Sequence, residues 1–206
     1  TKRKQKSPAR NRKPADMSPN EDSPKERPMD EQLRRFKACI RSVPDFPKPG
    51  IVFRDITPLI RDPEVLRGVV ERMADPFREQ RVDLVAGIES RGFIFGPAVA
   101  MELGVGFVPL RKPGKLPAET IRETYELEYG TDAVEIHADA VEPGQKVLLL
   151  DDLLATGGTM AASCRLVERL GGEVAGIVFL VELDFLNGRS KLDRYNPISL
   201  LHYESE

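Results

Sequence analysis

The chain has 206 residues, of which 40% are hydrophobic and 31% are charged, and its formal net charge at pH 7 is −2. This length and composition are typical of one soluble domain with a core of ordinary size. The two histidines and the two widely separated cysteines, Cys39 and Cys164, exclude most histidine-based metal centres and serine–histidine–aspartate hydrolysis. We expect reduced thiols, a cytoplasmic location and no membrane partner, since no apolar run approaches about 18 residues.

Residues 1–28 differ in composition from the rest of the chain. They carry nine Lys and Arg against four Asp and Glu, and almost no apolar side chains. Such a segment cannot bury enough surface to order itself, which predicts a disordered basic, proline-rich leader before a single domain at 29–206. A basic run is compatible with a nucleic-acid tether or a nuclear address, although a solvated tail is the commoner explanation. The acidic remainder of the chain argues against nucleic acid as the main partner.

Two helices are predicted in the first part of the domain. Apolar residues recur at helical spacing in residues 33–43, and Pro44 would end that helix. A second helix is predicted at 62–77, with Asp62 as its N-cap. The loop between them is punctuated by proline and glycine and contains an extended piece at 51–53.

Strands and helices then alternate along the chain. Continuous apolar strands that alternate with helices indicate a parallel sheet covered on both faces. The predicted fold is therefore α/β, with a central, mostly parallel twisted sheet flanked by helices, and ligands should bind beyond the carboxyl ends of its strands. The predicted strands are 83–88, 106–110, 146–150 and 174–183, and the predicted helices are 92–104 and 158–172.

The segment VLLLDDLLATGGTM, residues 147–160, is the most informative motif. It places Asp151 and Asp152 where an apolar strand is expected to end, directly before a turn rich in glycine and threonine. Glycines let the backbone approach a ligand closely, and the N–H groups of the turn and of the following helix would converge on one point with the threonine hydroxyls. This combination predicts a phosphate cradle formed by Ala155, Thr156, Gly157, Gly158 and Thr159.

The two carboxylates cannot themselves bind a phosphate, because like charges repel. They suit a ribose diol, a magnesium ion or positive charge that develops on a sugar ring. The chain contains neither the GxxxxGK[ST] nor the GxGxxG phosphate motif. A flavin-mononucleotide loop would leave the acid pair unexplained. A plain helix start beside solvent-facing acids is the remaining simple alternative.

The segment also resembles the signature with which type I phosphoribosyltransferases bind 5-phosphoribosyl-1-pyrophosphate (PRPP). Further segments resemble the adenine branch of that family, in the family's order over roughly residues 33 to 203. The resemblance implies transfer of the phosphoribosyl group from PRPP to adenine, giving AMP and pyrophosphate. The matching segments are PDFPKPGIVFRDITPL, GIESRGFIFGPAVA, RKPGKLP, YELEYG and LNGRSKL.

A second anion site is expected at ESRG, residues 89–92, where a small residue and a helix start accompany Arg91. The resemblance implies that Glu89, Ser90, Arg91 and Gly92 hold the pyrophosphate of PRPP, with a cis peptide between the first two. Residues 111–130 suit a flexible lid, although such a charge run alone is more typical of a solvated loop. The lid would bring three cations to the pyrophosphate, namely Arg111, Lys112 and Lys115.

The resemblance also implies a base site and a set of catalytic groups. Glu128 would manage a proton near N7 of the purine, although by sequence alone an exposed strand acid is the simpler explanation. Phe53 would stack on the base, but it could equally be a core residue. The implied adenine contacts are Val52, Phe53, Arg54, Leu153, Leu183 and Glu128, and the implied catalytic groups are Glu128, Asp151, Asp152 and Arg91.

Magnesium is the only cofactor expected, and it would arrive with PRPP rather than bind in a metal cage of the protein. The resemblance further implies a homodimer in which Arg111 can act across the interface. Two alternatives remain open at this point. One is a regulator that binds PRPP without catalysis, and the other is a phosphoribosyltransferase for guanine, xanthine or orotate.

Overall fold

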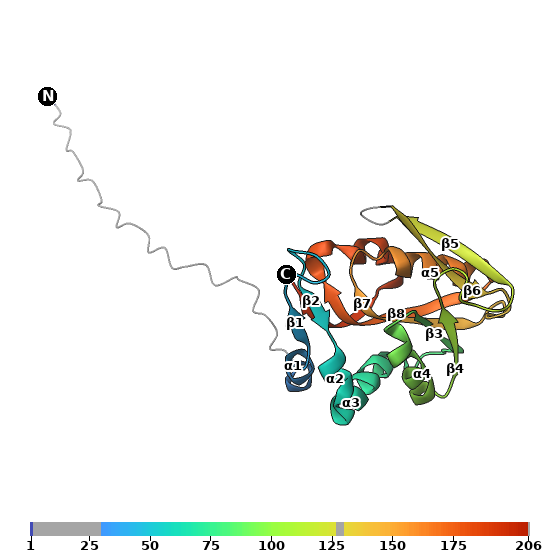
Figure 1. Ribbon diagram of the computed structural model, residues 1–206. Helices are drawn as coiled ribbons and strands as arrows, with labels where there is room; N and C mark the ends of the chain where they lie inside the picture. The colour runs from blue at the N-terminus through green and yellow to red at the C-terminus, as the bar shows by residue number, and fades with distance from the viewer. Residues whose placement is uncertain (2–29, 127–129, 206) are drawn as a thin grey trace.

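A parallel sheet forms the centre of the molecule. The computed structural model describes Thr1 and residues 30–126 and 130–205, and within these ranges five parallel strands pair in the order β4-β3-β7-β8-β9 (Figure 1). The expected parallel α/β architecture is thereby confirmed. The strands are β3 (Leu84–Ile88), β4 (Gly106–Leu110), β7 (Lys146–Leu154), β8 (Glu173–Leu183) and β9 (Ile198–Tyr203).

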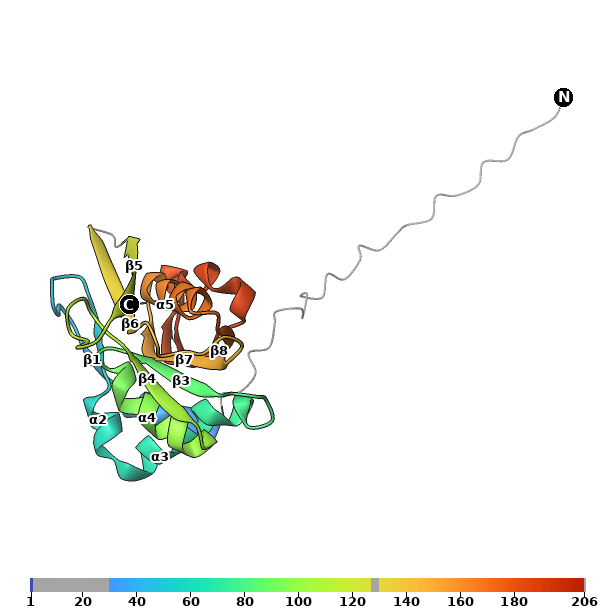
Figure 2. The ribbon, with the colours of Figure 1, turned by 90° about the vertical axis from the view of Figure 1, so that its right-hand side faces the viewer.

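Helices cover both faces of this sheet. Helices α3 (Pro63–Ala74) and α4 (Gly92–Leu103) lie on one face, and α5 (Gly158–Arg169) lies on the other (Figures 1 and 2). The apolar run of β7 serves both layers, because successive side chains of a strand point to opposite faces. Leu148 and Leu150 belong to the core on the α3–α4 side, whereas Val147 and Leu149 belong to the core under α5. A strand buried on both faces therefore has an uninterrupted apolar sequence.

Two small antiparallel pairs extend the domain beyond the central sheet. Strand β1 (Arg41–Val43) pairs with β2 (Phe53–Asp55), and β5 (Thr120–Glu126) pairs with β6 (Thr131–His137). The second pair packs against α5 and rises beside its N-terminus (Figure 1). Neither pair was expected as such from the sequence. Part of the predicted lid, residues 111–130, is thus a regular strand, and residues 127–129 lie outside the described ranges.

The first predicted helix is shorter in the structure than expected. Helix α1 spans Glu31–Ala38, and the residues that follow form β1 instead of continuing the helix toward Pro44. Pairing of β1 with β2, which lies about ten residues further along the chain, overrides the local helical pattern. The extended piece predicted at 51–53 likewise begins two residues later, as β2.

The later elements follow the predictions more closely. Asp62 caps α3 as expected, because its carboxylate accepts hydrogen bonds from the backbone N–H groups of Glu64 and Val65 at 3.0 and 3.2 Å. Helix α2 (Thr57–Arg61) precedes it. Strand β7 does not end at Leu150 but continues to Leu154, so that both acids of the motif lie within the strand. Strand β9 and three short 3₁₀ helices before it were not predicted.

The remaining general expectations concern cysteines, membranes and the leader. Cys39 and Cys164 are both free thiols, and Cys164, a residue of α5, faces the core as expected. Among the described residues, no helix is both long and apolar enough to span a membrane. The predicted leader at 1–28 lies outside the described residues except for Thr1, so the boundary at residue 29 remains a prediction.

We expect substitution of Asp62 by alanine to lower the free energy of unfolding by about 1 kcal/mol, because two N-terminal amides of α3 lose their acceptor. Urea denaturation followed by circular dichroism measures this change. Asp62→Asn is the matched control, since its amide oxygen can still accept the same hydrogen bonds. An equal loss in both variants would assign the effect to charge rather than to capping.

Candidate active site

Two adjacent acids form the centre of the candidate site. Asp151 and Asp152 lie in β7, where Asp151 pairs in register with Phe179 of β8. Asp152 is only 4% exposed, and Asp151 is half-buried. The carboxylate of Asp151 accepts a hydrogen bond from the backbone N–H of Asp152 at 2.8 Å. The sheet thus places two carboxylates next to each other where solvent access is limited.

The pKa values of both acids reflect this environment. Burial raises the pKa of Asp151 well above its usual value, and repulsion from Asp152 raises it further. Burial also raises the pKa of Asp152, although Arg91 opposes the shift. An ionised carboxylate is unfavourable at such a place unless positive charge approaches it. The pair is therefore suited to hydroxyl groups or to a ring that becomes positively charged.

The predicted phosphate loop lies directly after these acids. Gly157 has a φ of +74° and precedes the first residue of α5, Gly158, so that the amides of the helix start point into the loop. Asp151 and the five predicted loop residues line one hollow. Its other lining residues are Leu153, Leu154, Met160 and Phe179. The structure thus brings Asp151 and the loop into one hollow, and Asp152 is the next residue along β7.

Arg91 connects this site to the second predicted anion loop. Its Nε lies 2.9 Å from Oδ2 of Asp152, and its guanidinium lies 5.0 Å from the centre of the Phe53 ring. Gly92 is the first residue of α4 and packs closely against β7. A Cβ built on it would lie only 2.9 Å from Oδ1 of Asp151. The ESRG loop, the acid pair and the predicted base-stacking residue are therefore neighbours.

Glu89 holds two cations of the predicted lid. Its carboxylate lies 3.3 Å from Nε of Arg111 and 2.7 Å from Nζ of Lys115, and it accepts a hydrogen bond from the backbone N–H of Lys112 at 3.1 Å. Burial acts to raise the pKa of Glu89, but the bonds from Lys115 and Arg111 outweigh it and lower the pKa to about 2. The peptide bond between Glu89 and Ser90 is cis, as the resemblance implied.

The third predicted lid cation lies apart from the other two. The side chain of Lys112 donates a hydrogen bond to the Tyr125 hydroxyl at 2.8 Å and pairs with Asp132. The Lys112 side chain therefore points toward the β5–β6 pair, and Lys112 contacts Glu89 only through its backbone N–H. This ion pair connects Lys112 of the predicted lid to β6, which packs against α5.

The predicted base-site residues are distributed over three segments. Val52 and Phe53 are half-buried near β2, and Leu153 and Leu183 pack against the core at the ends of β7 and β8. The guanidinium of Arg54 turns away toward the C-terminal strand, where it lies 4.1 Å from the centre of the Tyr203 ring. Glu128 falls among residues 127–129, outside the described ranges.

Sequence reasoning missed two groups that border the site. Tyr125 of β5 lies over the start of α5, since a Cβ built on Gly158 would approach its ring to 3.1 Å. Gly188 lies against the phosphate loop and is followed by Arg189. The segment LNGRSKL was noted for its resemblance, but nothing in its local pattern shows which distant loop it touches.

The fold, with the acid pair and the two predicted anion loops at one edge of the sheet, is that of a phosphoribosyltransferase. Residues 59–202 match the model of the phosphoribosyl transferase domain, and the chain belongs to that family. Within the family it is a member of the adenine phosphoribosyltransferases, as its relatives show.

Relatives of this branch match nearly the whole described domain. The adenine phosphoribosyltransferase of Acidobacterium capsulatum is 58% identical over 168 residues, which are 82% of this chain and 93% of that protein. The crystal structure of the enzyme from Thermoanaerobacter pseudethanolicus is 57% identical, with a TM-score of 0.81, and covers 83% of this chain and 99% of that one. The structure from Saccharomyces cerevisiae, crystallised with adenine and an imino-altritol bisphosphate, is 43% identical with a TM-score of 0.76, over 82% and 96% of the two chains.

We expect Asp151→Asn to raise the melting temperature of the free protein at pH 7.5. Because the pKa of Asp151 is raised in the folded state, the stability of the protein falls as the pH rises from the ordinary pKa toward the raised one. The deficit shrinks as the pH falls toward the ordinary value of about 4, so the advantage of the variant should shrink at pH 5. Thermal denaturation at the two pH values measures this.

Asp83→Asn is the matched control for this experiment. The pKa of Asp83 is lowered, chiefly by the hydrogen bond it accepts from the backbone N–H of Lys146. Its ionised form therefore stabilises the fold, and the substitution should lower the melting temperature at pH 7.5. A loss of stability in both variants would contradict the proposed repulsion within the acid pair.

Proposed function

We propose that Asp151 and Asp152 are the centre of the chemistry by which the protein, as an adenine phosphoribosyltransferase, forms AMP and pyrophosphate from adenine and PRPP. The observation that carries this assignment is the acid pair, with Asp152 buried and Asp151 half-buried, directly before the predicted phosphate loop. The loop at 155–159 would hold the 5′-phosphate, which places the ribose hydroxyls over the carboxylates. As the anomeric carbon loses pyrophosphate, positive charge develops on the ring, and two nearby carboxylates stabilise it.

The leaving group requires positive charge at the opposite end of the sugar. Arg91, Arg111 and Lys115 are each paired with a carboxylate in the structure. In our proposal the pyrophosphate takes these cations from Glu89 and Asp152, while Ser90, Gly92 and Lys112 complete its binding site. Release of Arg91 would also leave Asp152 free to hold a ribose hydroxyl. Substrate binding would thus exchange the carboxylate partners of these cations for phosphate oxygens, so that no unpaired charge would be buried.

The base would bind between Phe53 and the end of β7. Leu153 and Leu183 would form the apolar wall, and Val52 and the backbone of Arg54 would border the ring. Because the guanidinium of Arg54 is occupied by Tyr203, Ser42 and Ser205, we assign its adenine contact to main-chain atoms. Glu128 would manage the proton at N7.

Magnesium is proposed to enter with PRPP. Arg91 already neutralises Asp152, and the lid cations already neutralise Glu89, so neither place is a ready-made cage for a divalent cation. Magnesium keeps several waters and prefers phosphate oxygens to such paired side chains. When bound, the ion would spread the charge of the leaving pyrophosphate. We further propose that the enzyme acts in the cytoplasm.

The base specificity and the role of Glu128 can be tested together. We expect AMP formation from PRPP, magnesium and adenine, and no nucleotide from hypoxanthine, guanine or orotate. Glu128→Ala should lower kcat at least 100-fold while largely preserving the affinity for PRPP, since the residue would act on the base alone. Steady-state kinetics and calorimetric titration with PRPP measure the two quantities.

Glu126→Ala is the matched control, because Glu126 is an exposed acid at the end of β5. Equal activity losses in the two variants would contradict a specific role for Glu128. Tight PRPP binding without turnover of any base would instead indicate a regulator.

We also propose a homodimer in which Arg111, on leaving Glu89 of its own subunit, serves the pyrophosphate of the neighbouring site. Light scattering should then give twice the monomer mass. Mixing Arg111→Ala with Glu128→Ala subunits should restore about a quarter of wild-type activity, because half of the random dimers are mixed and each would contain one intact site. No restoration, despite proven subunit exchange, would place Arg111 in its own subunit's site.

A further inference from the structure

The chain between β8 and β9 lies against the phosphate loop. It forms three 3₁₀ helices, η2 (Asp184–Leu186), η3 (Gly188–Lys191) and η4 (Asp193–Tyr195). A Cβ built on Gly188 would overlap the carbonyl oxygen of Ala155 and lie 2.9 Å from the backbone nitrogen of Gly157. A Cβ built on Gly157 would in turn overlap the carbonyl oxygen of Gly188. Two backbones therefore meet here without room for a side chain.

Glycine is required at position 188 because a side chain would not fit there, and not because the backbone adopts a positive φ. Glycines with positive φ in the described residues include Gly157 but not Gly188. Any residue could adopt the backbone conformation at position 188, yet only glycine lets η3 approach the loop so closely. The position of η3 consequently limits where the backbone of residues 155–157 can lie.

Arg189 links η3, which contacts the phosphate loop, to strand β8 of the central sheet. Its Nε donates to Oε1 of Glu182 at 2.9 Å, and its Nη2 donates to Oε2 at 2.5 Å. Its Nη1 donates to the carbonyl oxygen of Pro197 at 2.6 Å. Glu182 lies on β8 and is only 4% exposed. The side chain that follows Gly188 is thus bound by a two-pronged ion pair and anchored to the chain before β9.

The ion pair is strong enough to keep the buried acid charged. Burial acts to raise the pKa of Glu182, but the hydrogen bonds from Arg189 and Ser199 outweigh it, so that the pKa is lowered. Removing the arginine would leave a buried carboxylate without its partner, which is costly. The position of Arg189 is therefore fixed by Glu182.

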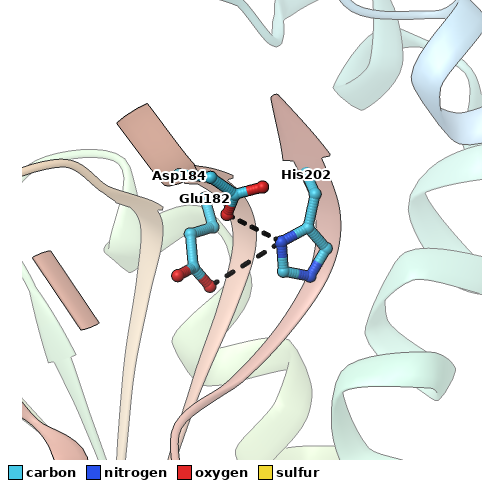
Figure 3. Close-up of side chains that lie close together, drawn as sticks. All are labelled: Glu182, Asp184 and His202. Atoms are coloured by element: carbon cyan, nitrogen blue, oxygen red, sulfur yellow. Dashed lines mark hydrogen bonds and ion pairs between the residues drawn. The ribbon is translucent and has the colours of Figure 1, made fainter. Parts of the chain in front are cut away.

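A neighbouring histidine makes the surroundings of Glu182 resemble a metal site. Glu182, Asp184 and His202 offer three ligand atoms within 4.8 Å of one another (Figure 3). Nδ1 of His202 lies 2.9 Å from Asp184 but 4.0 Å from Glu182. Both oxygens of Glu182 already accept hydrogen bonds from Arg189, so a cation would have to displace the guanidinium. This geometry favours an anchor for Arg189 over a metal centre.

We propose that Arg189 is a positioning residue for the phosphate loop, acting through the backbone contact of Gly188 with residues 155–157. This inference rests on the proposed role of that loop in holding the 5′-phosphate. A loop that binds an anion through its amides depends on their exact spacing, and misplacement by about 1 Å can cost up to 100-fold in rate. Loss of the ion pair should therefore weaken ligands that carry a 5′-phosphate and spare those that lack one.

The test compares AMP with pyrophosphate as calorimetric probes, the latter with magnesium. Arg189→Met should raise the Kd for AMP about tenfold and leave the Kd for pyrophosphate unchanged within about twofold. Arg189→Lys should give an intermediate value, because an ammonium keeps the charge but cannot bond both oxygens of Glu182. The KM for PRPP should rise in the same order.

Arg194→Met is the matched control. Arg194 lies on the neighbouring η4 and pairs with the exposed Glu168 at 2.8 Å, away from the phosphate loop. Its removal should leave both Kd values unchanged. Equal weakening of AMP and pyrophosphate by Arg189→Met, or a lower melting temperature with unchanged AMP affinity, would overturn the proposal and leave Arg189 a purely structural role.

Gly188→Ala provides a second route if Arg189→Met fails to fold. It keeps the ion pair but places a methyl group against Ala155, so the Kd for AMP should again rise about tenfold. Thr159→Val separates the inference from the proposed function. If this variant does not weaken AMP, the loop does not hold the phosphate. If it does, while Gly188→Ala and Arg189→Lys have no effect, the positioning role alone is wrong.

Discussion

The repulsion between two neighbouring carboxylates, of which Asp152 is buried and Asp151 half-buried, is the constraint on which the site depends. Asp151 and Asp152 lie in the central sheet, where burial raises the pKa of each. Such a pair persists because its surroundings supply positive charge, with Arg91 at 2.9 Å from Asp152. In the proposed mechanism, a sugar ring that becomes cationic would relieve the same repulsion. The repulsion within the acid pair would thus make the site complementary to the charge that develops.

The same principle extends to the outer part of the site. Arg111 and Lys115 are paired with Glu89, and these are the cations that we propose bind the pyrophosphate. In the proposed mechanism, each of these cations would exchange its carboxylate partner for an oxygen of the pyrophosphate. Farther out, the buried pair of Glu182 and Arg189 acts on geometry instead of charge, because it fixes the chain that contacts the phosphate loop. Charge balance and backbone position are therefore controlled by separate ion pairs.

The differences between expectation and structure share one physical origin. Residues 41–43 have a helical pattern but form β1, and β7 continues past Leu150 through both acids. In each case a partner strand distant in sequence supplies hydrogen bonds that a local pattern does not contain. Asp151 pairs with Phe179, and Leu154 pairs with Glu182. Within the predicted flexible lid, residues 120–126 likewise form β5, which pairs with β6.

The sequence by itself determined the elements whose signals are local. The apolar run of β7 indicated a strand buried on both faces, Asp62 marked the start of α3, and the order of acids, glycines and threonines indicated the phosphate loop. Only the tertiary structure decided which distant groups meet. The pairing of Lys112 with Asp132 and the approach of Gly188 to Ala155 depend on chain paths between residues 20 to 33 positions apart. Such contacts arise from the packing of whole elements, and no local pattern encodes them.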